Sequence, residues 1–277
     1  METRNLKNWE ELEKGLGELF KLHAGMQKKT ERRVVSNLLF RGQSDSEWKL
    51  KTTLERNSDE SMNLLEYYSI ILAVKSEIET FTGRSWIIPS ATEFSAILAR
   101  QFGLGGFHRK DVHEYMAYLR HNGFPSPLLD WTTSPYIAAY FAFRGADPQK
   151  EGEEPSVAIY AFIEYPGGIK RGLVAEPFIF SLGPTIKVHP RHFLQKCQYT
   201  MCCVKKGDGQ KIYSSHEDVF ARDERGQDLL WKFIIPVTQR TEVLKRLEIS
   251  NINSYSLFGS EESLIETIAI RKFTIKE

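Results

Sequence analysis

The sequence predicts an α+β fold, with a helical N-terminal half packed on a mixed or antiparallel sheet. Apolar residues recur at helical spacing through most of the chain up to residue 143. Segments rich in β-branched and aromatic residues follow, separated by turn-rich stretches such as residues 145–155. Helices followed by strands are typical of α+β domains rather than of alternating α/β folds.

The first half is predicted to be a succession of helices. Residues 9–22 form an amphipathic helix, with leucines and aromatic residues on one face and acidic residues on the other. The basic run at residues 28–33 is interpreted as a solvated connection, with phosphate contact as the alternative. Residues 1–33 are therefore assigned to an N-terminal helix and basic connection, and residues 34–277 to one continuous globular unit. Three more helices are predicted, at residues 62–81, 93–102 and 113–121.

Composition limits the classes of partner. The net charge is +1, from 37 basic and 36 acidic residues, so no overall field favours nucleic acid or an anionic membrane. The three cysteines, Cys197, Cys202 and Cys203, are odd in number and close together, which suits buried thiols in a reducing compartment. No apolar run approaches the roughly 20 residues that span a bilayer. We therefore expect a cytoplasmic protein without a membrane partner.

The segment at residues 34–40 is predicted to be a strand that ends in Phe40-Arg41-Gly42-Gln43. Gly42 permits close approach of another backbone, because it has no Cβ. Arg41 offers a rigid fork of donors that suits a carboxylate or a phosphate. The alternative is a structural arginine paired with a buried acid.

A polar corner at residues 130–134 precedes a helix that is apolar on every face. Ser134 suits the N-cap and Pro135 the first helical position. Because a helix apolar all round is buried, Asp130 at this corner needs hydrogen bonds or a chemical task.

The second half is predicted to supply the sheet and the last helices. The strands are expected at residues 157–163, 178–180, 198–204 and 231–237, and the helices at residues 240–249 and 260–268.

The residues exclude several common sites. The histidines are scattered and do not meet a cysteine or carboxylate at the usual ligand spacing, so no metal site is expected. No nucleophile elbow, phosphate-binding P-loop or zinc-protease motif is present. Cys202 and Cys203 lie in a hydrophobic strand, where burial would raise the thiol pKa and lower the reactivity.

The remaining candidate site combines Arg41, the corner at residues 130–134 and a later polar residue. Arg41 and the helix N-terminus would take phosphate groups, and the hydroxyls would take a ribose or carboxamide of an anionic dinucleotide. The alternative is a buried polar network that only fixes the core, with Asp130 capping backbone amides.

Several blocks of the sequence resemble the FRG domain family, which is named for a Phe-Arg-Gly tripeptide. The resemblance covers roughly residues 34–265 and rests on Phe40-Arg41-Gly42-Gln43 with Trp48, on residues 120–125, on Leu128-Leu129-Asp130-Trp131-Thr132-Thr133-Ser134-Pro135 with residues 139–142, and on residues 191–200 and 257–259. In the third block the family usually has Gly where this chain has Cys197, and Phe where it has Tyr199. FRG domains are widespread in bacteria and phages.

The order of the blocks also resembles, more weakly, the layout of ADP-ribosyltransferases. In those enzymes a first-strand residue orients NAD, a second strand supports the nicotinamide pocket, and a third residue stabilises the oxocarbenium-like ribose or positions the acceptor. The resemblance implies NAD as substrate and catalytic roles for Arg41 and Gln195, although Gln195 cannot act as a carboxylate. The cofactor-binding residues that it implies are Arg41, Gly42, Asp130, Trp131, Thr132, Thr133, Ser134 and Tyr140.

Two functions follow as hypotheses. The first is a nucleotide-binding enzyme of ADP-ribosyltransferase or NAD-cleaving type, acting as a bacterial toxin or anti-phage effector on an unknown protein or nucleic-acid acceptor. The second is a non-catalytic module that binds a nucleotide, a nucleic acid or a protein through the same pocket. The enzyme hypothesis requires that Arg41, Thr132 and Gln195 line one cleft.

Overall fold

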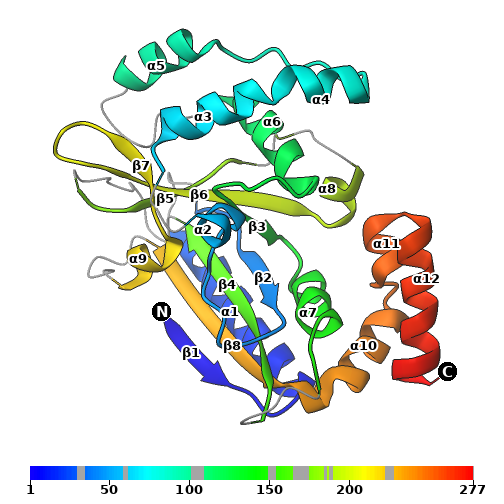
Figure 1. Ribbon diagram of the computed structural model, residues 1–277. Helices are drawn as coiled ribbons and strands as arrows, with labels where there is room; N and C mark the ends of the chain where they lie inside the picture. The colour runs from blue at the N-terminus through cyan, green and yellow to red at the C-terminus, as the bar shows by residue number, and fades with distance from the viewer. Residues whose placement is uncertain are drawn as a thin grey trace.

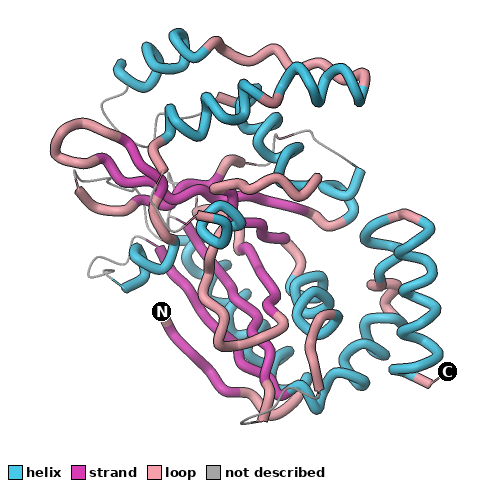
Figure 2. The backbone as a smooth tube through the Cα atoms, viewed as in Figure 1, coloured by secondary structure: helices cyan, strands magenta, loops and turns pink. Residues whose placement is uncertain are grey.

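The computed structural model describes residues 1–29, 35–58, 62–100, 109–148, 154–164, 175–183, 186, 190–221 and 228–276. Over these residues the chain forms one eight-stranded mixed sheet with helices packed around it, which confirms the α+β class (Figures 1 and 2). Most of the predicted basic connection at residues 28–33 falls outside the described residues.

The strands follow the order β1-β8-β4-β2-β3-β6-β5, and β7 pairs with β6. β1 and β8 run parallel, whereas the other pairs are antiparallel. The sheet is therefore mixed. The strands are β1 (Glu2–Asn5), β2 (Leu39–Gln43), β3 (Leu128–Thr132), β4 (Ser156–Glu164), β5 (Phe178–Ser181), β6 (Cys197–Lys205), β7 (Lys211–Tyr213) and β8 (Asp228–Pro236).

The helices largely match the predicted segments, but the helix expected at residues 62–81 is split in two at Val74. In the described part of the chain, no helix has the length and apolar character needed to cross a bilayer. The α-helices are α1 (Trp9–Lys29), α2 (Thr53–Asn57), α3 (Leu64–Ala73), α4 (Lys75–Thr82), α5 (Ala91–Arg100), α6 (Lys110–His121), α7 (Pro135–Arg144), α8 (Pro190–Leu194), α9 (His216–Ala221), α10 (Arg240–Ile249), α11 (Ser254–Phe258) and α12 (Glu261–Ala269).

The strand predicted at residues 34–40 is instead β2, which begins at Leu39 and includes Arg41 and Gly42. The prediction was wrong because alternation and apolar character do not show where a partner strand begins. β4 pairs with β2 only from Leu39 to Gln43. Arg41 therefore sits within a paired strand rather than after its end.

The sheet changes direction between β2 and β3. These strands share one register pair, Phe40 with Thr132, whereas β3 pairs with β6 along its whole length. Figure 1 shows β6 running across the ends of β2 and β4 at a steep angle. One helical layer, with α1, α7 and α10, covers the β4 half, and α3, α5 and α6 cover the β6 half. A third apolar cluster, which includes Leu39, Trp131 and Phe162, fills the angle between the halves.

α7 packs against β2 at a glycine. Ser134 accepts a hydrogen bond from the Ile137 amide and Pro135 opens the helix, as predicted. A methyl group at Gly42 would clash with the Ala138 carbonyl oxygen and would lie 2.7 Å from the Ala142 amide nitrogen. The close approach of β2 and α7 therefore requires glycine at this position.

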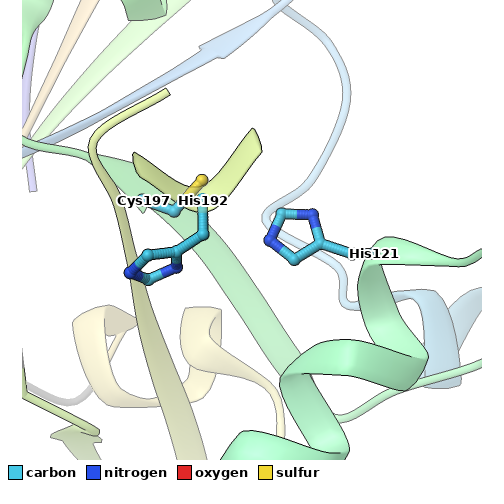
Figure 3. A group of neighbouring side chains, drawn as sticks. All are labelled: His121, His192 and Cys197. Carbon is cyan, nitrogen blue, oxygen red and sulfur yellow. The ribbon is translucent and has the colours of Figure 1, made fainter. Parts of the chain in front are cut away.

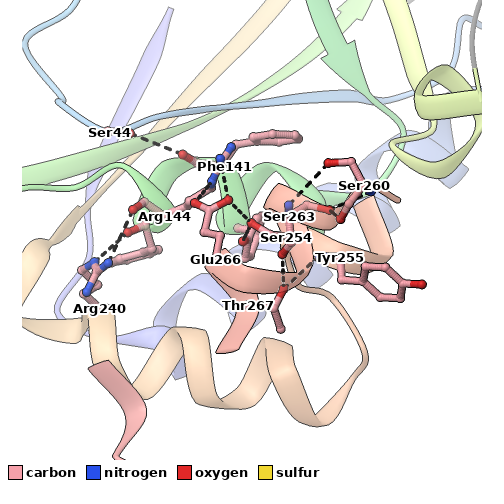
Figure 4. Close-up of polar contacts among 12 residues, drawn as sticks. Ser44, Phe141, Arg144, Arg240, Ser254, Tyr255, Ser260, Ser263, Glu266 and Thr267 are labelled. Carbon is pink, nitrogen blue, oxygen red and sulfur yellow. Dashed lines mark hydrogen bonds and ion pairs between the residues drawn. The ribbon is translucent and has the colours of Figure 1, made fainter. Parts of the chain in front are cut away.

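The C-terminal helices are fastened to α7 by a polar cluster (Figure 4). Arg144 donates two hydrogen bonds to the Glu266 carboxylate, at 2.6 and 2.7 Å, and Ser254 Oγ donates to the same carboxylate at 2.6 Å. The Tyr140 hydroxyl lies 2.6 Å from Ser254 Oγ. Burial alone would raise the pKa of Glu266, but the bonds from Arg144 and Ser254 outweigh it and the pKa falls below its ordinary value.

Replacing Gly42 by alanine is expected to destabilise the fold by about 3 kcal/mol or more, because the methyl group must push α7 away from β2. The matched control is Gly17→Ala in α1, where an added Cβ meets nothing within 4 Å. That control should stabilise the chain by up to about 1 kcal/mol through helix propensity. Urea unfolding of both variants gives the comparison, and equal midpoints would contradict the proposed close packing.

Glu266→Gln is expected to lower the free energy of unfolding by about 1 kcal/mol at neutral pH. The stability of the variant should also depend less on pH in the acid range. The folded-state pKa of Glu266 is lowered, so its contribution is complete above the unfolded pKa of about 4.3 and is lost as pH falls through the folded value. Thermal melts from neutral pH to about pH 3 test this. Glu261→Gln, on the exposed side of α12, should leave the wild-type pH profile intact.

Candidate functional site

A cavity of about 750 Å³ opens where β2 and β3 diverge. This volume is within the usual range for pockets that bind small molecules or cofactors. The walls come from β2, the following loop, α2, the end of α6, β3, α7 and the start of β6. The lining residues are Phe40, Arg41, Gly42, Gln43, Ser44, Glu47, Trp48, Lys49, Lys51, Arg56, Arg120, His121, Asp130, Trp131, Thr132, Ala138, Phe141, Gln195 and Cys197.

Arg41 reaches across the gap between the two strands. Its Nη1 donates to the backbone oxygen of Asp130 at 2.8 Å, the place that a strand amide would occupy in a regular ladder. Burial lowers the pKa of Arg41 to about 10; Asp130 raises it, whereas Arg120 and Arg56 lower it further. The guanidinium stays charged at neutral pH. Its buried Nε has no hydrogen-bond partner among the described residues.

Asp130 pairs with Arg120 at the C-terminal end of α6. The Arg120 Nη2 donates to Asp130 Oδ2 at 2.5 Å, and both side chains are mostly buried. A cation in the last turn is also favourable for the helix dipole. In the described part of the chain, Asp130 Oδ1 and Arg120 Nε are buried and lack partners. The ion pair thus keeps one acceptor and one donor for a further group.

The cavity wall is strongly cationic. Its cationic side chains are Arg41, Lys49, Lys51, Arg56 and Arg120, against the acidic side chains of Glu47 and Asp130. Burial is the main cause of the lowered pKa of Arg41, and the positive charges of Arg120 and Arg56 lower it further, as neighbouring like charges do. An anion in the cavity would relieve this repulsion.

Aromatic surface also faces the cavity. Trp48 lines it while 55% of its surface is exposed, and Phe141 of α7 lies on the wall. An exposed indole of this kind offers a flat surface on which a planar heterocycle can stack. Sequence reasoning missed the loop residues at 47–51 as site candidates, because alternating lysines and a tryptophan are equally typical of a solvated strand or loop.

The predicted site residues fall into two groups. Arg41, Thr132 and Gln195 line the same cavity, which meets the requirement of the enzyme hypothesis. Gly42, Asp130 and Trp131 also line it. The Trp131 indole is nevertheless mostly packed in the core. Its Nε1 donates to Thr200 Oγ1 at 2.8 Å, and its ring stacks on Phe162.

The other three predicted residues lie elsewhere. Thr133 is exposed, and its amide donates to the Lys196 carbonyl at 3.2 Å. Ser134 caps α7, and the Tyr140 hydroxyl lies within hydrogen-bond distance of Ser254 Oγ. None of the three is among the residues that line the cavity.

The Gln195 side chain lies in the cavity wall, where both ends of its amide are hydrogen-bonded to protein groups. It is 8% exposed, its Nε2 donates to the Leu257 carbonyl at 3.2 Å, and its Oε1 accepts from Cys197 Sγ at 3.6 Å. Both ends of the amide are therefore occupied by protein groups, and they connect the cavity to α11.

Beside Gln195, two histidines, a tyrosine and a cysteine converge. Tyr199 Oη lies 2.5 Å from His121 Nε2 and 3.1 Å from His192 Nδ1. Burial raises the pKa of the Cys197 thiol to about 12 and lowers the pKa of His192. Figure 3 shows His121 approaching from α6 on one side, with His192 and Cys197 on the other. No spacing along the chain indicates this grouping, because its members come from α6, α8 and β6.

Comparisons with known proteins identify one family. A family model for the FRG domain matches residues 36–151, a shorter span than the resemblance at residues 34–265 suggested. No curated protein and no solved structure matches the chain. The matched span includes every cavity-lining residue except Gln195 and Cys197. The match to the FRG domain model thus covers residues 36–151, and the cavity is built chiefly from residues of that span.

Proposed function

We propose that the cavity binds an anionic nucleotide, with NAD as the first candidate, and that the protein is an enzyme of ADP-ribosyltransferase or NAD-cleaving type. The observation that carries this proposal is the combination of a cationic wall and an exposed tryptophan in one cavity of about 750 Å³. Guanidinium and ammonium groups suit a pyrophosphate, and Trp48 suits a base or nicotinamide ring. The cavity volume is adequate for a ligand of this class.

Arg41 is the best-placed phosphate ligand. One end of its guanidinium is fixed by the Asp130 backbone oxygen, while its Nε has no partner among the described residues. A guanidinium held in this way loses little freedom when it binds an oxyanion. Arg56 and Lys51, on and before α2, supply further positive charge on the same wall.

Asp130 is the carboxylate best suited to the chemical step. When NAD is cleaved, the bond between ribose C1′ and the nicotinamide nitrogen breaks, and the electron pair leaves with nicotinamide. Water or an acceptor nucleophile then adds at C1′ and loses a proton. A carboxylate near C1′ would stabilise the developing positive charge. Asp130 Oδ1 is the unpartnered oxygen for this role, and Gln195 positions the wall beside it.

Such chemistry would also account for a role as a toxin or anti-phage effector. Removal of NAD, or modification of an essential protein or nucleic acid, stops growth of the cell in which it occurs. The acceptor would reach C1′ through the open mouth of the cavity.

A second candidate function is a non-catalytic nucleotide-binding module. It is favoured by Gln195, an amide that is already bonded at both ends where the enzymes that the chain resembles carry a third catalytic group. In that case the cavity would bind NAD without releasing nicotinamide.

Arg41→Gln is expected to weaken NAD binding by about 10- to 100-fold. A hydrogen bond to a charged group contributes about 1.5–3 kcal/mol, which corresponds to a loss of affinity of this size. Isothermal titration calorimetry measures this, with Arg4→Gln as the matched control, because Arg4 lies on β1, pairs with Glu2 and Glu18 and does not line the cavity. Lys51→Ala, at an exposed wall position, gives a second test that does not disturb the strand. Unchanged affinity in both cavity variants, with wild-type melting, would reject the nucleotide site.

Asp130→Asn is expected to reduce nicotinamide release from labelled NAD by about 100-fold or more while leaving NAD affinity within a few-fold. Asp111→Asn, which removes a carboxylate paired with Arg109 at the other end of α6, is the control and should keep full activity. If wild-type protein binds NAD but releases no nicotinamide and modifies no lysate component, the non-catalytic module replaces the enzyme.

A further inference from the structure

We propose that His121, His192 and Cys197 form a binding site for one divalent transition-metal ion, with Zn²⁺ as the expected metal. Their ligand atoms all lie within 4.8 Å of one another (Figure 3). The residues are brought together by three elements, α6, α8 and β6. The proposal stands independently of NAD binding.

The donor set fits the metal. Two imidazoles and one thiolate are ligands that zinc takes in proteins, at about 2.0–2.1 Å for nitrogen and 2.3 Å for sulfur. A tetrahedral centre with these bonds places its ligand atoms about 3.3–3.7 Å apart. The present separations of up to 4.8 Å require small side-chain rotations rather than movement of the backbone.

The two imidazoles are already aimed at one point. His121 Nε2 and His192 Nδ1 both face the Tyr199 hydroxyl, at 2.5 and 3.1 Å, and the His192 ring stacks on the tyrosine ring. The rings of His121 and His192 meet edge to face. The tyrosine therefore holds both rings near Cys197 before a metal arrives.

The position of the cluster favours an accessible metal rather than an enclosed structural one. His121 and Cys197 line the cavity, so an ion between them can be reached from the ligand space. Three protein ligands leave a fourth position of a tetrahedral zinc for water or for an anionic group in the cavity, as in catalytic zinc sites. The neighbouring charges, Asp130 and Arg120, form an ion pair with each other and so add little net charge.

Binding involves no oxidation or reduction. The S–H bond of Cys197 breaks, its proton goes to solvent, and the sulfur electron pair forms the bond to zinc. The histidines bind as neutral rings. One proton is therefore released for each ion bound, apart from any proton lost by water at the fourth position.

The test uses the full chain without a histidine tag, stripped of metal with a chelator and titrated with Zn²⁺ and Co²⁺. We expect one ion per chain, release of a proton detectable by calorimetry in buffers of different ionisation enthalpy, and a sulfur-to-cobalt charge-transfer band. Added zinc should also raise the melting temperature.

Cys197→Ser and His192→Gln should each weaken zinc binding by at least about 10-fold, since even groups that only support a ligand cost 10- to 100-fold. The matched controls are Cys202→Ser, a buried thiol bonded to the Ser215 carbonyl, and His23→Gln, bonded to the Ser36 carbonyl; both should bind zinc normally. His192 is half-buried on α8, so its variant remains informative if Cys197→Ser fails to fold. Absence of zinc binding by the wild type, a cobalt complex without the sulfur band, or equal loss in the controls would overturn the proposal.

Discussion

The separation of β2 from β3 beyond the Phe40–Thr132 pair is the constraint on which the cavity depends. A regular ladder would close this space with backbone hydrogen bonds. Instead, Arg41 donates to the Asp130 carbonyl and so satisfies a buried acceptor while leaving the strands apart. The third apolar cluster, which includes Leu39, Trp131 and Phe162, draws its side chains from strands on both sides of this gap. The Arg41 side chain thus replaces a missing backbone hydrogen bond of the sheet and places a positive charge on the cavity wall.

The Phe-Arg-Gly tripeptide makes three different contacts along one strand. Phe40 is buried in the core beneath α7, Gly42 permits the helix backbone to approach, and Arg41 points to the gap. Side chains alternate across a strand, so the phenylalanine and glycine share one face and the arginine takes the other. The tripeptide therefore couples helix packing to cavity formation. A change that displaces α7 would also move the wall that carries Ala138 and Phe141.

The features that could be predicted from the sequence are those set by neighbouring residues. The Ser134 cap and Pro135 start of α7 were predicted, and so were most helices, because capping and helical periodicity are properties of neighbouring residues. It placed the start of β2 wrongly, because that boundary is set by pairing with β4, more than a hundred residues later. The sequence could only set the requirement that Arg41, Thr132 and Gln195 line one cleft; the fold brings these three residues to one cavity. The cluster of His121, His192 and Cys197 was missed because ligand spacing along the chain says nothing about residues on separate elements.

The parallel pairing of β1 with β8 has a consequence for the order of folding. Glu2 lies opposite Trp231 and accepts a hydrogen bond from its indole, so the first strand joins the sheet only when one of the last strands is present. Contacts between residues so far apart in the chain are slow to form and leave an edge open meanwhile. During synthesis, the FRG domain segment would emerge from the ribosome before the strand that fastens the N-terminus. The sheet is thus expected to acquire this edge only after β8 has been synthesised, and the edge of β8 that does not pair with β4 stays open to solvent until β1 docks.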